Sequence, residues 1–172
     1  MKLKVMKIPV SDMLDSPDAP IPNQIAEWRE DFLNRMFYVK ATEVLPIMIA
    51  GRSFMDGEDT MFIGMLSTKD EVPTCVEHLL DNGAMWVSSI MEAHFYTVDD
   101  GGNKNPGTKQ ECLIFASYAD SWQEMAIQPF SREFGDRGLP FPSGVLQIHS
   151  SGTDGPILGG ALVPFQAKQE NN

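Results

Sequence analysis

The run of sequence that decides the fold spans residues 84–130 and reads AMWVSSIMEAHFYTVDDGGNKNPGTKQECLIFASYADSWQEMAIQPF. Residues 84–96, 112–118 and 122–130 are rich in aromatic and aliphatic side chains, which favour β-strands. Their succession predicts an antiparallel three-stranded meander. Residues 98–109 separate the first two strands and are dominated by Gly, Asn, Asp and Pro, so we predict a mobile loop there.

Two amphipathic helices and a hairpin precede this run. Residues 24–37 place apolar side chains at helical spacing, namely Ile25, Trp28, Phe32 and Met36. Residues 70–82 carry the clearer apolar stripe, namely Val72, Cys75, Val76, Leu79 and Leu80. Between the two helices, residues 44–51 and 59–66 are apolar runs separated by an Asp-Gly turn signal, which predicts a β-hairpin.

These elements predict an α+β fold: a mainly antiparallel sheet, built from the hairpin and the three-stranded meander, with about two helices packed on one face. We divide the chain into three parts. Residues 1–22 are an N-terminal strand and an extended connector, and residues 23–130 are the α+β core domain. Residues 131–172 are rich in Gly and Pro, and we interpret them as an extended C-terminal arm packed on the core or on a neighbour.

Charge and cysteine content restrict the classes of partner. The 172 residues carry a formal net charge of −11, which opposes binding to nucleic-acid phosphates and to anionic membranes. Cys75 and Cys112 are too few for a disulfide framework or a zinc site, and their apolar neighbours predict buried, reduced thiols. We expect neither a signal peptide nor a membrane span. The expected location is therefore the cytoplasm, with proteins or small molecules as partners.

The sequence lacks the short motifs of nucleotide, metal and acyl-transfer sites. It has no Gly-x-x-x-x-Gly-Lys loop, no Gly-x-Ser-x-Gly and no His-Glu-x-x-His. A segment beginning at Asp100 has Glu111 at the twelfth position of a calcium loop. However, Gly102 replaces a ligand there and Asn105 replaces the required glycine. We expect no cofactor and no metal.

One set of titratable residues has a spacing suited to acid–base chemistry. Glu92 and His94 are two positions apart on the strand predicted at residues 84–96, so they point to the same face. A carboxylate beside an imidazole orients the ring and raises its basicity. Depending on the strand register, the neighbouring strand adds Glu111 or Cys112, so a Cys112–His94–Glu92 catalytic site is one hypothesis. The alternative is a polar patch on the solvated side of the sheet.

Methionine is abundant, with 11 residues in the chain. Several of them, including Met48, Met61 and Met65, fall in predicted strands. Core filling explains such positions, and the alternative is an adaptable binding surface, because the methionine side chain is flexible and polarizable.

Residues 84–130 resemble uncharacterised proteins of phages and bacteria. The resemblance is carried by Met85-Trp86-Val87-Ser88, by Glu111-Cys112-Leu113-Ile114-Phe115 and by the final Pro129-Phe130. It covers about a quarter of the chain and implies no activity. Because catalytic motifs are missing and residues 131–172 are predicted to form a Gly- and Pro-rich arm, we expect a non-enzymatic interaction or assembly protein that binds a protein partner or itself. One hypothesis is that it is phage-encoded and located in the virion. The alternative function is that of a small hydrolase or transferase using Glu92, His94 and Cys112.

Overall fold

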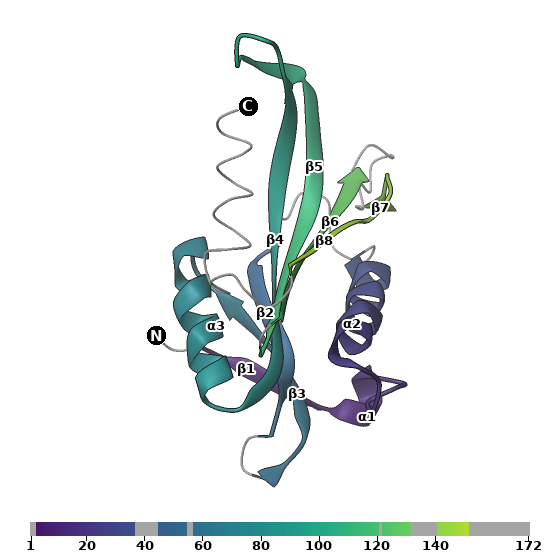
Figure 1. Cartoon of the computed structure of the whole chain (residues 1–172), viewed down its shortest axis with the longest axis vertical. Helices are drawn as coiled ribbons and strands as arrows, with labels where there is room; N and C mark the ends of the chain where they lie inside the picture. The colour runs from purple at the N-terminus through teal and green to yellow at the C-terminus, as the bar shows by residue number, and fades with distance from the viewer. Residues whose placement is uncertain (1–2, 37–44, 55–56, 121, 132–140, 152–172) are drawn as a thin grey trace.

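One antiparallel sheet organises the molecule (Figure 1). The computed structural model describes residues 3–36, 45–54, 57–120, 122–131 and 141–151. These residues form an eight-stranded sheet. Its strands are β1 (Val5–Pro9), β2 (Ile47–Ser53), β3 (Thr60–Leu66), β4 (Ala84–Val98), β5 (Lys104–Ala119), β6 (Trp122–Ser131), β7 (Phe141–Pro142) and β8 (Gln147–Ser151). The helices are α1 (Val10–Met13), α2 (Ile21–Met36) and α3 (Val72–Asp81), the last preceded by the 3-10 turn η2 (Lys69–Glu71). The predicted α+β class with a mainly antiparallel sheet is confirmed.

The order of the strands is β1-β3-β2-β4-β5-β6-β7, and β8 also pairs with β6. β2 and β3 form a hairpin in which Ala50 lies opposite Ile63. β2 pairs on its other side with β4, where Ala50 lies opposite Ser88, so the hairpin and the later strands share one continuous sheet. The detail of a hairpin plus a three-stranded meander is therefore matched only in part. The sheet also extends beyond both, through β1 at one edge and β7 and β8 at the other.

The helices cover opposite faces of the sheet, which corrects the expectation that they pack on one face (Figure 1). α2 packs over one face, called here the α2 face, and α3 packs over the other, the α3 face. The physical reason is visible in β5, because every residue from Cys112 to Ala119 is buried. Side chains alternate between faces along a strand, so an unbroken buried run requires a cover on both sides.

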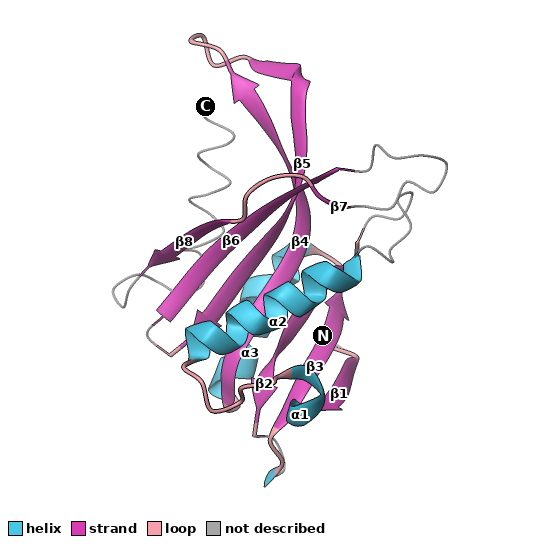
Figure 2. Cartoon of the chain, turned by 90° about the vertical axis from the view of Figure 1, so that its right-hand side faces the viewer, coloured by secondary structure: helices cyan, strands magenta, loops and turns pink. Residues whose placement is uncertain are grey.

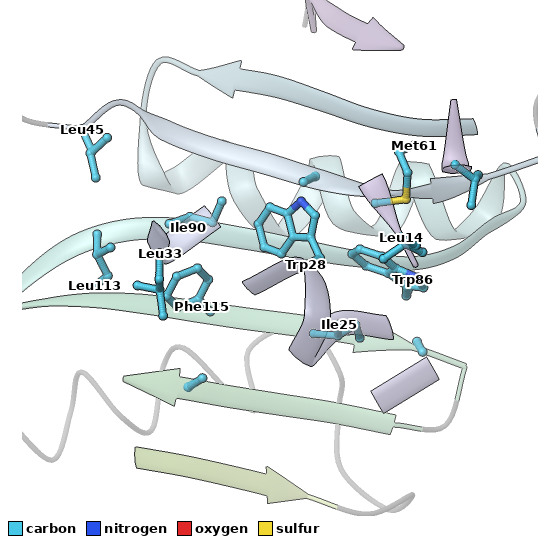
Figure 3. Close-up of a cluster of buried hydrophobic side chains, with 14 of the residues drawn as sticks. Leu14, Ile25, Trp28, Leu33, Leu45, Met61, Trp86, Ile90, Leu113 and Phe115 are labelled. Carbon is cyan, nitrogen blue, oxygen red and sulfur yellow. The ribbon is translucent and has the colours of Figure 1, made fainter. Parts of the chain in front are cut away.

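α2 lies across one face of the sheet (Figure 2), and aromatic side chains fix it there (Figure 3). Trp28 is fully buried, and its ring centroid lies 6.2 Å from those of Trp86 on β4 and Phe115 on β5. Phe32, one helical turn later, lies 5.7 Å from Phe115 in an edge-to-face arrangement. Such ring pairs add about 0.5–1.5 kcal/mol each beyond the burial of apolar area.

α3 begins and ends with recognisable local signals. The Glu71 carboxylate accepts hydrogen bonds from the backbone amides of Ser67 and Thr68, at 3.0 and 3.2 Å, which satisfies donors before the first turn. The helix is followed by Gly83 with a φ of 94°, a conformation that favours glycine. Its buried stripe is Val72, Cys75, Val76 and Leu79.

The two ends of the chain add short elements to the core. The predicted connector within residues 1–22 contains α1, and α2 starts at Ile21. From the predicted C-terminal arm, β7 and β8 pair with β6. Residues 132–140 and 152–172 lie outside the described residues. No described helix has the length and apolar character needed to cross a membrane.

A two-stranded ribbon replaces most of the predicted mobile loop at residues 98–109. β4 pairs with β2 only as far as Ile90, and β5 pairs with β6 only from Glu111 onward. Residues 95–110, called here the β-ribbon, continue as β4 paired with β5 alone among the described strands. The β-ribbon projects from the sheet at the top of Figure 1. Only residues 99–103 form its turn.

Candidate functional site

The structure places Glu92 and His94 on the α2 face, as their spacing predicts. Glu92 lies opposite Leu113, and His94 lies directly opposite Glu111. Residues directly opposite each other in an antiparallel pair share a face, so His94 has carboxylates from β4 and β5 as neighbours on that face. His94 is exposed, whereas Glu92 and Glu111 are half-buried. This cluster lies at the base of the β-ribbon.

Cys112 does not join this cluster, which corrects the hypothesis of a Cys112–His94–Glu92 site. Its register partner is Ala93, one residue from both Glu92 and His94, so it points to the α3 face. The side chain is 0% exposed. The alternative register, with Glu111 beside His94, is the one that the structure adopts.

Burial also suppresses the nucleophilicity of the Cys112 thiol. It raises the pKa of Cys112 to about 12, and the thiol donates a hydrogen bond to the Ala93 carbonyl oxygen at 3.6 Å. Burial likewise raises the pKa of Cys75 on α3. Because the thiolate is the reactive form, neither cysteine is prepared for nucleophilic attack near neutral pH.

Glu92 has a local structural contact. Its Oε1 atom accepts a hydrogen bond from the backbone amide of Leu45 at 3.2 Å, at the point where the chain approaches β2. The side chain therefore ties β4 to the segment that precedes β2. Among the described residues, no group of His, Cys, Asp and Glu has the geometry of a metal site.

The structure contains a buried ion pair under α2 that the sequence analysis does not predict. Arg29 of α2 is 3% exposed, and its guanidinium donates a 2.5 Å hydrogen bond to Glu124 of β6, which is 7% exposed. Arg29 lies outside the apolar stripe of Ile25, Trp28, Phe32 and Met36, so the spacing of the helix does not predict its burial. One signal in the sequence indicates that Glu124 is buried: side chains alternate along a strand, so Glu124 shares a face with the apolar Ala126 and Phe130.

A second buried network joins Arg52 of β2 to Gln24 in the first turn of α2 and, through Gln24, to the segment before that helix. Arg52 donates to both carboxylate oxygens of Asp59, at 2.9 and 2.6 Å, and to Gln24 Oε1 at 2.9 Å. The same amide oxygen accepts from the Trp86 indole at 3.1 Å, and the Gln24 amide nitrogen donates to Ala19 O at 2.8 Å. Each of these buried polar groups has a partner, which is typical of a structural network.

The turn of the β-ribbon is held by a single carboxylate. Asp99 Oδ1 accepts from the backbone amides of Gly101 and Asn103, at 2.9 and 2.8 Å. These hydrogen bonds lower the pKa of Asp99, and the hydrogen bond from the Asn103 amide has the largest effect. Gly102 has a φ of 81° and donates its amide proton to the Asp99 carbonyl oxygen at 3.0 Å. The turn is therefore a defined structure.

Polar contacts order the two strands of the β-ribbon behind this turn. The backbone amide and the hydroxyl of Thr97 both contact the hydroxyl of Thr108, at 2.8 Å. The Lys104 ammonium lies 5.6 Å from the centre of the Tyr96 ring. A shift of register between Phe95 and Thr97 marks a bulge, and bulges bend and twist a strand pair.

Comparison with known proteins gives no relative. No protein-family model matches the chain, and no curated protein or solved structure matches it either.

Proposed function

We propose that this chain is a non-enzymatic interaction or assembly protein whose binding element is the β-ribbon. The observation that carries the proposal is the extension of β4 and β5 beyond the strands that flank them. An isolated two-stranded hairpin is marginally stable in water, and sheets normally gain stability from a third strand or a packed helix. A ribbon built this way is suited to acquiring that support from another protein.

The composition of the β-ribbon supports a binding role. Its turn and the start of β5 are exposed, and residues 99–107 carry Asp99, Asp100 and Lys104. Tyr96 and Val98 are half-buried, so the ribbon also offers apolar and aromatic surface. Aromatic residues bordered by charged ones are common in protein interfaces, because the ring supplies contact area at a low entropic cost.

The organisation of the turn favours the same role. The hydrogen bonds of Asp99 and the contact between Thr97 and Thr108 fix the ribbon before it meets a partner. Preorganisation lowers the entropic cost of binding. The acid–base alternative has weaker support, because the Cys112 thiol and the His94 imidazole lie on opposite faces of the sheet.

Site-directed photo-crosslinking tests the proposal. A photoreactive amino acid replaces Asn103 in the turn of the β-ribbon, and in a matched control it replaces Glu77, which is also exposed, on α3. We expect crosslinked protein products from position 103 that increase with protein concentration, and far fewer from position 77. Equal crosslinking from both positions, or none from position 103 at any concentration up to the solubility limit, would contradict the proposal.

A shortened variant gives an independent measurement. Replacing residues 97–108 with an Asn-Gly turn removes the β-ribbon beyond Tyr96 and leaves the pairing of β4 with β2 intact. We expect the unfolding temperature of the core to change little and the crosslinking partner to be lost. A variant that keeps the same association as the full chain would show that the ribbon is not the binding element.

A further inference from the structure

The sheet edge farthest from β6 has an unusual surface for this chain. β1 is the outermost strand on that side and pairs only with β3 among the described strands. Although the chain carries a net charge of −11, this edge is basic, with Lys4 and Lys7 both exposed. An outer strand leaves one row of backbone donors and acceptors open to pairing with another strand.

Exposed methionines border the same edge. Met6 is 60% exposed and lies opposite Ile63 of β3. Met65 of β3 is 61% exposed and lies opposite Met48 of β2, which is half-buried. Strand alternation places these residues together on the α2 face. Large exposed apolar side chains grouped in this way mark interaction surfaces, and methionine adapts its shape to a partner.

We propose that the β1 edge receives the β-ribbon of a second copy of this chain, in a head-to-tail contact; this inference rests on the proposed role of the β-ribbon. The edge of β4 near Tyr96 and Val98, with which no described strand pairs, would add to β1 as a further strand. Strand addition supplies backbone hydrogen bonds, and the exposed Met6 and Met65 gain contact with the aromatic and aliphatic side chains of the ribbon.

The distribution of charge favours this head-to-tail contact over a symmetric contact between two β1 edges or two ribbon turns. Two β1 edges facing each other would bring Lys4 and Lys7 of both copies together, and two ribbon turns would bring together their Asp99 and Asp100 carboxylates. Like charges placed opposite each other on neighbouring strands are destabilising. The two acidic side chains of the ribbon lie in its turn, whereas Lys104 and Lys109 lie on β5, away from the β4 edge, so pairing the turn of one copy with the β1 edge of the next brings opposite charges together.

The geometry of the contact predicts its consequences. The β-ribbon of one copy and the β1 edge of the next are different surfaces, so the contact is heterologous, and a pair of copies still has one free ribbon and one free edge. Such contacts build rings or open filaments. A contact of a few strand residues is small compared with a stable interface, so we expect weak association that depends on concentration and weakens with added salt.

A charge-swap experiment tests the inference. The edge variant carries Lys4→Glu and Lys7→Glu, and the ribbon variant carries Val98→Lys and Asp100→Lys. Asp99 is left intact because it holds the turn. Sedimentation velocity over a range of concentrations, at low and at high salt, measures association, and circular dichroism checks that each variant is folded.

Each variant alone presents like charges at the contact, and we expect association only at roughly tenfold higher concentration than in the parent chain. An equimolar mixture pairs Glu edges with Lys ribbons and Lys edges with Asp ribbons, so we expect association to return. Parent-like association of the edge variant, or a mixture that stays monomeric, overturns the inference, as does a parent chain that is monomeric at every concentration.

The crosslinking experiment separates this inference from the proposed function. Mass spectrometry of the product formed from position 103 identifies the partner peptide. A peptide containing residues 4–9 supports the head-to-tail contact. Crosslinks to another part of the chain, or to a different protein, support a binding role for the β-ribbon and overturn the proposed occupant of the β1 edge.

Discussion

Cys112 and His94 lie on opposite faces of the sheet, because Cys112 is paired with Ala93 and His94 with Glu111. The Cys112 thiol is fully buried on the α3 face and donates a hydrogen bond to the Ala93 carbonyl oxygen of β4. This arrangement separates the two groups that a cysteine-based acyl-transfer site would need within hydrogen-bond distance.

The first prediction concerns thiol reactivity. With its pKa raised to about 12, Cys112 has a thiolate fraction of about one in ten thousand at pH 8. In a Cys75→Ala variant, we expect an aromatic disulfide reagent to label Cys112 very slowly in the native protein and rapidly in denaturant. The absorbance of the released thiolate measures the rate. Fast labelling of the native variant would contradict the buried position.

The second prediction concerns the ion pair between Arg29 and Glu124. Glu124→Gln leaves the Arg29 charge buried without its counter-charge, which costs about 3–5 kcal/mol in the free energy of unfolding. Urea denaturation followed by tryptophan fluorescence measures this loss. The matched control is Asp31→Asn on the same helix, where Asp31 pairs with the exposed Arg35 at 3.1 Å.

An exposed pair of this kind contributes about 0–1 kcal/mol, so the control variant should remain close to the parent in stability. A similar small loss in both variants would indicate that Glu124 is solvated. Replacing both partners, as Arg29→Met with Glu124→Leu, should recover much of the stability, because the buried charges are then removed together.

The third prediction is a dependence of stability on pH that arises at Asp59. The hydrogen bond from Arg52 lowers the pKa of Asp59 below its ordinary value. The unfolded chain therefore binds a proton at Asp59 at a higher pH than the folded chain does. This contribution to stability is fully present above the ordinary carboxyl pKa of about 4 and is lost as the pH falls through the lower folded value.

Comparison with Asp59→Asn isolates this contribution. We expect the parent chain to be more stable than the variant at pH 7, and the difference in urea midpoint to shrink as the pH falls below about 4. Glu58→Gln, at the neighbouring exposed position, serves as the control. A difference between the parent and Asp59→Asn that stays constant from pH 7 to pH 2 would contradict the assignment.

The fourth prediction concerns the close approach of strands at Gly51. A Cβ atom there would lie 2.4 Å from the Trp86 carbonyl oxygen and 2.6 Å from the Phe62 ring. Gly51→Ala should therefore lower the free energy of unfolding by about 1–3 kcal/mol or more, because one of the obstructing atoms, the Trp86 carbonyl oxygen, belongs to the backbone. Gly107→Ala is the control, since its Cβ meets only Asn105 Oδ1 at 3.4 Å. Equal stability of the two variants in thermal unfolding would contradict the packing.

The sequence predicted the elements best where the signal is local. The apolar stripe of α3, from Val72 to Leu79, is visible in the spacing of the residues, and the hairpin of β2 and β3 follows from apolar runs around a turn. The composition of residues 98–109 predicts a mobile loop, whereas only residues 99–103 form the turn. Whether Lys104 to Lys109 form a strand depends on pairing with β4 across the turn, which composition does not encode.

The candidate site illustrates the same limit. That Glu92 and His94 share a face follows from the alternation of side chains along any strand. Which residue of β5 joins them depends on register, and a shift by one residue exchanges Glu111 for Cys112. The sequence alone leaves both registers open, whereas packing both faces of β5 under α2 and α3 selects one.

By itself, then, the sequence determined the class of the fold, most of its helices and strands, and the acidic character of the chain, because propensity and periodicity act over a few residues. Only the tertiary structure decided that α2 and α3 cover opposite faces, that Arg29 meets Glu124 beneath α2, and that β4 and β5 extend into a ribbon. These features depend on contacts between residues far apart in the chain, whose free energy is set by the packed arrangement of the whole sheet.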